Sequence, residues 1–146
     1  MINENDVINA VCKRLKELKF QINQSLHTSE KGIDIIAERE DFTLFIEAKG
    51  GTSSKETTRR FGKPFNIGQV KNHIGKALLA TVKQLSIIQE SSNMGVAIAL
   101  PDTSDHRRII EEISYVLKKI NIIVFWVKDN LSVDIDLNNS NNQPIR

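Results

Sequence analysis

Two apolar runs in the first half of the chain, residues 32–37 and 42–50, are separated only by a short polar segment. Both runs are rich in Ile and Phe and are bounded by turn residues, which is typical of buried strands. The connection between them is short enough for a hairpin. Folding the hairpin about Glu40 and Asp41 sets Asp34 directly opposite Glu47.

The rest of the chain alternates between helical and strand periodicities. Apolar residues recur at three- and four-residue spacing in the expected helices, whereas the later strands are continuous apolar runs that need cover on both faces. The expected elements are helices over residues 3–19 and 68–89 and after a capping turn at 102–105, and strands over 94–100, 122–127 and 131–135. The pattern therefore predicts an α/β three-layer sandwich, with helices flanking a mixed central sheet in the order α-β-β-α-β-α-β.

The last predicted helix has an apolar stripe and a polar start. We expect His106, Arg107 and Arg108 to face solvent there. The stripe that we expect to face the core consists of Ile109, Ile110, Ile113, Val116, Leu117 and Ile120.

Composition indicates an ordinary globular chain. Its 146 residues, 40% of them hydrophobic and 26% charged, suit one domain, expected over residues 1–137, followed by an asparagine-rich tail at 138–146 that we expect to be disordered. A single cysteine, Cys12, excludes a disulfide framework and a cysteine-based zinc site. The N-terminus is unlike a signal peptide and no apolar run is long enough for a bilayer, so we expect a cytoplasmic protein without a membrane partner.

Charge is distributed unevenly along the chain. The whole chain carries a net charge of only +2, yet residues 49–76 hold seven basic residues against one acid. Residues 50–67, here called the basic flap, are rich in Gly, Ser and Thr and have no periodicity, which predicts a mobile loop. Such a loop suits a nucleic-acid backbone, and its alternative is an ordinary solvated basic loop. The flap residues expected to contact nucleic acid are Lys55, Arg59, Arg60 and Lys63.

The predicted hairpin register creates a charge conflict. Like charges directly opposite each other on paired strands are destabilising, and neither Asp34 nor Glu47 lies in a segment polar enough to be freely solvated. A divalent cation, Mg²⁺ or Mn²⁺, would resolve the conflict. Lys49 lies two residues after Glu47, so its side chain leaves the same face of the strand. The alternative is a structural Glu47–Lys49 salt bridge with Asp34 in a turn.

The spacing Asp-x12-Glu-x-Lys, from Asp34 to Glu47 and Lys49, resembles the motif of the PD-(D/E)XK nuclease superfamily, which has the restriction-endonuclease-like fold. The resemblance extends to the order of helices and strands, although Ile33 stands where the motif nominally has proline. It implies a metal-dependent phosphodiesterase acting on nucleic acid. It also implies that Asp34 and Glu47 bind the metal and that Lys49 acts as the motif lysine.

Glu4 falls on the apolar stripe of the first predicted helix, where a carboxylate needs a partner. Many members of the superfamily place a glutamate of the first helix near the metal, so the resemblance implies an accessory ligand here. The alternative is an acid favoured by the helix dipole alone.

Gln69, His73 and Lys76 align along one ridge of the helix expected at 68–89. The resemblance implies a glutamine near the active site on this helix, commonly followed four residues later by tyrosine, so that His73 departs from the pattern. Gln69 is therefore a candidate catalytic residue, and His73 and Lys76 are candidates for nucleic-acid contact. The alternative is a solvated helix edge.

These observations predict a Mg²⁺- or Mn²⁺-dependent endonuclease acting on nucleic acid, with DNA as the expected substrate. A domain of this size holds one active site, so cleavage of both strands of a duplex requires two copies or two encounters. A homodimer or a nicking activity therefore follows. Two other functions stay open: a nucleic-acid-binding module without turnover, and an interaction protein whose carboxylate pair is only structural.

Overall fold

The computed structural model describes residues 1–27, 30–53, 57, 59, 61–89, 91–136 and 145. Three helices and six strands follow one another along the chain. The helices are α1 (Glu4–Glu17), α2 (Ile67–Ile88) and α3 (Ser104–Lys119). The strands are β1 (Gln21–Ser25), β2 (Ile35–Arg39), β3 (Phe42–Ala48), β4 (Met94–Pro101), β5 (Ile122–Val127) and β6 (Val133–Asp136).

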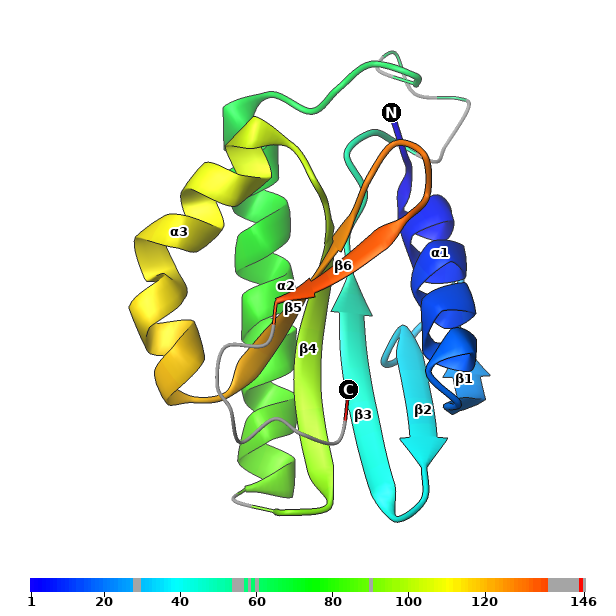
Figure 1. Cartoon of the computed structure of the whole chain (residues 1–146). Coiled ribbons are helices and arrows are strands. Elements are labelled where there is room, and N and C mark those ends of the chain that lie inside the picture. The colour runs from blue at the N-terminus through cyan, green and yellow to red at the C-terminus, as the bar shows by residue number, and fades with distance from the viewer. Residues whose placement is uncertain are drawn as a thin grey trace.

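All six strands form one mixed sheet in their order along the chain, from β1 to β6 (Figure 1). The pairs β3–β4 and β4–β5 are parallel, and the remaining pairs are antiparallel. In the β2–β3 hairpin Ile35 pairs with Ile46 and Ala37 with Leu44, which confirms the predicted register. The three-layer α/β architecture expected from the sequence is likewise confirmed.

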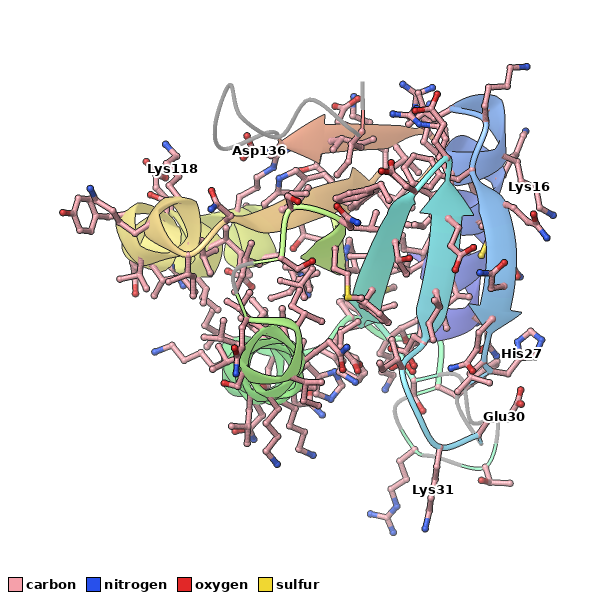
Figure 2. All side chains as sticks on the ribbon, turned by 90° about the horizontal axis from the view of Figure 1, so that it is seen from below. Lys16, His27, Glu30, Lys31, Lys118 and Asp136 are labelled. Carbon is pink, nitrogen blue, oxygen red and sulfur yellow. The ribbon has the colours of Figure 1, made fainter. Side chains whose placement is uncertain are left out.

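The helices cover opposite faces of this sheet. In Figure 2 α1 lies on one side, whereas α2 and α3 lie on the other, with the labelled side chains of Lys16 and Lys118 projecting into solvent. Alternate residues of β5 enter different cores: Ile123 and Phe125 pack on the α1 side, and Val124 and Trp126 on the α2–α3 side. All six residues of β5 are therefore buried, which explains the unbroken apolar run.

Two expectations for α3 are wrong. His106 is only 1% exposed, because it begins the buried face of the helix and its Nδ1 lies 2.6 Å from the hydroxyl of Thr103, the N-cap. Val116, expected in the core, is 55% exposed. It lies at the margin of the apolar stripe, where burial depends on whether a neighbouring element covers that flank.

The C-terminal tail is described at one residue only. Ile145 is 2% exposed and belongs to the core on the α1 side, while residues 137–144 and 146 lie outside the described residues. Disorder of the tail as a whole stays a prediction. Within the described ranges, no helix is long and apolar enough to cross a membrane.

Candidate functional site

The open end of the β2–β3 hairpin brings together the two acids that the register predicted to face each other. Asp34 precedes β2 and is 9% exposed, and its Oδ2 accepts a hydrogen bond of 2.8 Å from the backbone N–H of Ala48. The Asp34 carboxylate thereby accepts from a backbone N–H that lies just beyond Ile35–Ile46, the last residue pair of the β2–β3 ladder at this end. A hydrogen bond also links the side chains of Asp34 and Glu47.

Glu47 has an unusual protonation equilibrium. Burial, together with the charge and hydrogen bond of Asp34, raises the pKa of Glu47 to about 8, and the opposing effect of Lys49 is smaller. Two carboxylates this close cannot both ionise without an added positive charge, so one retains a proton. A buried carboxyl group whose pKa lies near neutral pH, beside a specific charged partner, is typical of functional sites.

Glu4 and Lys49 complete the cluster. The Nζ of Lys49 lies 3.8 Å from a carboxylate oxygen of Glu4, and both side chains are about one-fifth exposed. Burial raises the pKa of Glu4, the charge of Lys49 lowers it, and the charge of Asp34 raises it. The structure thus places Glu4 with Asp34, Glu47 and Lys49 in one electrostatic unit.

The start of α1 lies directly against the backbone of Gly50, which only a residue without a side chain permits. A Cβ built on Gly50 would lie 2.3 Å from the backbone nitrogen of Glu4 and 2.6 Å from the carbonyl carbon of Asn3. The N-terminal segment is held there because Gly51 donates a backbone hydrogen bond of 2.8 Å to Ile2, and Asn3 forms a parallel bridge with Thr52. Asn3 also begins α1 as the N-cap of a capping box.

The cluster lies at the carboxyl end of the parallel part of the sheet. Glu47 pairs with Ile98 of β4, and the backbone N–H of Lys49 donates to Ala99 at 3.0 Å. This edge is where open α/β sheets usually carry their ligand sites.

Gln69 has a local structural role in α2. Its Oε1 accepts a hydrogen bond of 3.0 Å from Asn66 N–H, and its own N–H donates to Asn66 Oδ1, so the two residues form a capping box. Only the side-chain amide hydrogens remain as donors for a phosphate. The catalytic role of Gln69 stays a prediction.

His73 is half-buried, and the charge of Lys49 affects it, so it is not simply a residue of a solvated helix edge. Its ring makes an edge-to-face contact with Phe65, with centroids 4.4 Å apart. Burial lowers the pKa of His73, and the charges of Lys49 and Lys76 lower it further. His73 is therefore neutral at pH 7 and does not add positive charge for phosphate binding. Lys76 is exposed on the same helix.

Two hydrogen bonds join the two ends of the basic flap to each other. The Thr52 hydroxyl donates to the carbonyl of Lys63 at 2.6 Å, and the Phe65 N–H donates to the carbonyl of Gly51 at 2.9 Å. Arg59 and Lys63 are exposed, whereas Lys55 and Arg60 lie outside the described residues.

The donor set fits a hard divalent cation. Over the described ranges, no group of three or more His, Cys, Asp and Glu residues is arranged as a ready metal site. Mg²⁺, however, keeps several waters and takes only one or two protein carboxylates. Asp34 and Glu47 supply two carboxylates, and a cation beside them would offset the burial and the negative charge that raise the pKa of Glu47.

Two solved structures resemble the chain over most of its length. An XisH family protein from Nostoc punctiforme matches with a TM-score of 0.55 and 14% identity, over 90% of this chain and 95% of that one. An fdxN element excision controlling factor protein from Anabaena variabilis matches with a TM-score of 0.56 and 15% identity, over 88% and 96%. The fold is restriction-endonuclease-like. At these identities the likeness shows the fold alone, and no family description and no curated protein matches the sequence.

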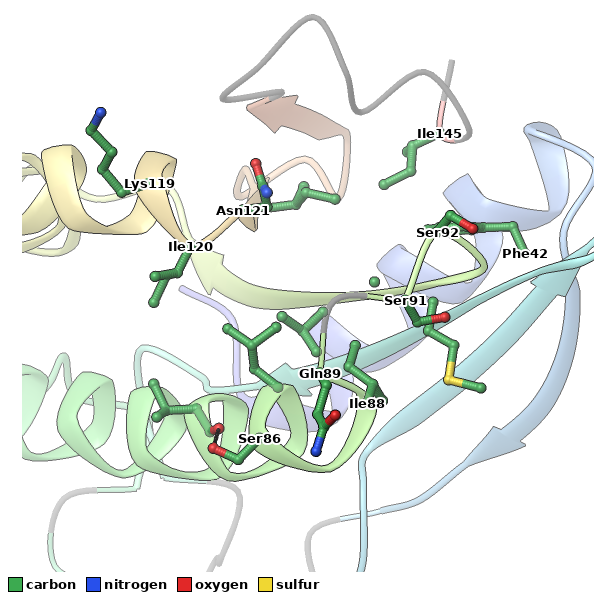
Figure 3. Close-up of a pocket in the computed structure, with 16 residues that line it drawn as sticks. Phe42, Ser86, Ile88, Gln89, Ser91, Ser92, Lys119, Ile120, Asn121 and Ile145 are labelled. Atoms are coloured by element: carbon green, nitrogen blue, oxygen red, sulfur yellow. Dashed lines mark hydrogen bonds between the residues drawn. The ribbon is translucent and has the colours of Figure 1, made fainter.

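A separate hollow lies in another part of the molecule. This pocket, of about 780 Å³, is formed where α2 and α3 end and β4 begins, and its lining includes Ile88, Gln89, Ile120 and Asn121 (Figure 3). Met94 and Gly95, which start β4, also line it. The pocket is thus at the end of β4 opposite the carboxylates. We assign the chemistry to the carboxylates, because Lys119 is the one charged side chain among the described residues that line the pocket.

Sequence reasoning did not anticipate Gly50, Phe65 or His106. The adjacent pair Gly50-Gly51 after Lys49 was an available signal for a close backbone approach. The contact of Phe65 with His73 leaves no local pattern in the sequence. The burial of His106 did have a signal, because Ile109 and Ile110 follow it at the i+3 and i+4 spacing of one helix face.

Proposed function

We propose that this protein is a metal-dependent nuclease that hydrolyses phosphodiester bonds in nucleic acid. The observation that carries the proposal is the hydrogen-bonded pair Asp34–Glu47, with Lys49 and Glu4 beside it. A purely structural cluster would pair its charges, whereas this one has three acids and one base and retains a proton near neutral pH.

Each group has a distinct role in this proposal. Asp34 and Glu47 bind Mg²⁺ or Mn²⁺, with Glu4 as an accessory carboxylate. Lys49 stabilises charge on the reacting phosphate or orients the attacking water. The bound ion would neutralise phosphate charge and activate water. Basic residues around the site neutralise the nucleic-acid backbone: Lys55, Arg59, Arg60, Lys63 and Lys76.

DNA is the favoured substrate. One structural neighbour is described as an element excision controlling factor, and excision of a genetic element is a reaction of DNA. A chain with one active site would nick a duplex as a monomer and cut both strands as a homodimer.

A nucleic-acid-binding module without turnover is the second candidate. It is favoured by the partners that the key groups already have, since Lys49 pairs with Glu4 and Asp34 accepts from Ala48 N–H. The two candidates differ only in cleavage.

A cleavage panel tests the proposal. Plasmid, linear duplex, single strand, flap, four-way junction and RNA are incubated with Mg²⁺ or Mn²⁺ and wild-type protein. Lys49→Ala should lower cleavage by at least about a hundredfold while binding persists, because an electrostatic group at the reacting phosphate contributes that much. Asp34→Asn should lose metal binding and cleavage together. Lys118→Ala, an exposed lysine on α3, serves as the matched control and should cut like wild type.

Absence of cleavage from the entire panel would favour the binding module. A Lys49→Ala protein that cuts as fast as wild type would contradict the assigned mechanism. Gel analysis of nicked against linear plasmid, combined with sedimentation, separates a monomer that nicks from a dimer that cuts both strands.

A further inference from the structure

Phe61 is the exposed member of the chain's six phenylalanines. Its exposed fraction is 47%, whereas Phe20 and Phe125 are buried and Phe42, Phe45 and Phe65 pack against the two cores. Packing in the two cores therefore accounts for five of the six rings, and among the described residues Phe61 belongs to neither core.

The surroundings of Phe61 are basic and open. Arg59 and Lys63, two residues to either side, are exposed as well. Gly62 adopts φ +76°, and a Cβ built on it would have no heavy atom within 4 Å. The turn is thus open around Gly62, next to Phe61. An aromatic ring between cations is the arrangement that proteins use to bind single-stranded nucleic acid.

The flap's attachment limits how far Phe61 can lie from the carboxylates. Lys63, whose carbonyl accepts from the Thr52 hydroxyl, is two residues from Phe61, and so no more than about 7 Å away along the chain. Thr52 is three residues from Lys49, or at most about 11 Å. Since a strand advances about 3.4 Å or more per nucleotide, the ring lies within a short oligonucleotide's length of Lys49.

We propose that Phe61 stacks on an unpaired base, so that the site takes nucleic acid with single-stranded nucleotides beside the scissile bond. The inference deepens the proposed nuclease function and rests on it. Bases inside a duplex already stack on their neighbours. A protein ring can therefore reach the flat face of a base only where that base is unpaired. Every base offers such a face, and the contact therefore selects strand state without selecting sequence.

Binding in EDTA tests the proposal without cleavage. Anisotropy gives the affinity for a single strand and for the duplex of the same sequence, and 2-aminopurine in the single strand reports stacking. Wild type should prefer the single strand and quench the probe. Phe61→Ala should weaken single-strand binding by about five- to a hundredfold, the range for loss of one base-stacking contact, and should leave duplex binding within twofold.

Further variants separate stacking from apolar contact. Phe61→Trp should keep the affinity and the quenching, whereas Phe61→Leu, which is apolar but not flat, should resemble Phe61→Ala. Tyr115→Ala is the matched control, because Tyr115 is a 72% exposed aromatic residue on α3 with Lys119 beside its ring. It should bind like wild type.

Several outcomes would overturn the role of Phe61. They are unchanged single-strand affinity in Phe61→Ala, equal loss for single strand and duplex, full affinity in Phe61→Leu, and a dimer that dissociates on Phe61→Ala. Any of these leaves the nuclease proposal standing. A wild-type protein that binds neither form of nucleic acid would overturn both.

Discussion

Two charged clusters lie at the same edge of the sheet and are built in opposite ways. Asp102 directly follows β4, and its carboxylate oxygens accept from Nε and Nη2 of Arg107 at 2.7 and 2.9 Å. The Arg107 guanidinium also lies 4.0 Å from the centroid of the buried Trp126 ring. One acid and one base satisfy each other here, and the hydrogen bond from Arg107 lowers the pKa of Asp102.

The cluster after β3 leaves its charges unbalanced. Glu4, Asp34 and Glu47 share the single base Lys49, and the pKa of Glu47 rises to about 8. The opposite shifts of Glu47 and Asp102 arise because a matched base favours the charged acid, whereas burial beside another acid disfavours it. The pairing of charge, more than its presence, distinguishes a candidate binding site from a structural ion pair.

Gly50→Ala should have the largest effect on stability. It acts on the cluster of Glu4, Asp34, Glu47 and Lys49, here called the unbalanced cluster, and leaves the Asp102–Arg107 pair, the balanced cluster, unchanged. The new Cβ meets backbone atoms of Asn3 and Glu4 that cannot rotate away, so the free energy of unfolding should fall by about 3 kcal/mol. Urea denaturation measures this change. Gly75→Ala, at a helical position with open space, should raise stability by about 0.5–1 kcal/mol. Equal stability of the two variants would contradict the close approach of α1.

Glu47→Gln should remove the loss of stability that Glu47 causes as the pH rises. The folded pKa of about 8 exceeds the ordinary value of 4.5, so folding favours the protonated acid. Its contribution is fully present below pH 4.5 and is lost as the pH rises through 8. At pH 9 we expect Glu47→Gln to be more stable than wild type by about 2–3 kcal/mol. Denaturation between pH 5 and 9 tests this, with the exposed Glu38→Gln as a control that should follow wild type.

Divalent metal should stabilise the wild type and leave the balanced cluster unaffected. At a hundred times its dissociation constant, Mn²⁺ bound to the folded state adds about 2.7 kcal/mol to the free energy of unfolding. Asp34→Asn should lose this gain and Asp102→Asn should keep it. Calorimetric titration and thermal denaturation measure the two effects. An unchanged melting temperature in millimolar metal would favour a structural role for the carboxylates.

The Asp102–Arg107 pair should show the smallest effect. Its geometry is bidentate, but Arg107 is 44% exposed and water screens the charge. A double-mutant cycle with Asp102→Asn and Arg107→Gln should give a coupling of about 1 kcal/mol that decreases with salt. A coupling that is insensitive to salt would mean that packing on Trp126, rather than charge, holds the pair.

The local parts of the fold and site could be predicted well. Residues 122–127 were expected as a strand and form β5, and the expected helix at 68–89 is α2, Ile67–Ile88. Asp34, Glu47 and Lys49 could be placed together because one hairpin with a short connection determines their relative positions. Residues 131–135 were less well predicted, since β6 begins at Val133 after Leu131 adopts φ 67°.

Other features depend on elements distant in the sequence. Val116 is at a margin of the α3 stripe, and only the packing of α3 on the sheet and beside α2 decides that this margin stays uncovered. The contact between Phe65 and His73 likewise depends on how the flap returns to α2. Helical periodicity defines the centre of an apolar face, but it does not define how much of the helix surface the neighbouring elements cover.

The sequence by itself determined the strand and helix periods, the hairpin register and the meeting of Asp34 with Glu47, because these depend on residues close together in the chain. The tertiary structure decided that Glu4 reaches Lys49, that Gly50 must lack a side chain, and that Asp102 and Arg107 neutralise each other over Trp126. The physical reason is range. Backbone hydrogen bonding and side-chain alternation act between neighbours, whereas the pairing of buried charges depends on which surfaces the whole core brings together.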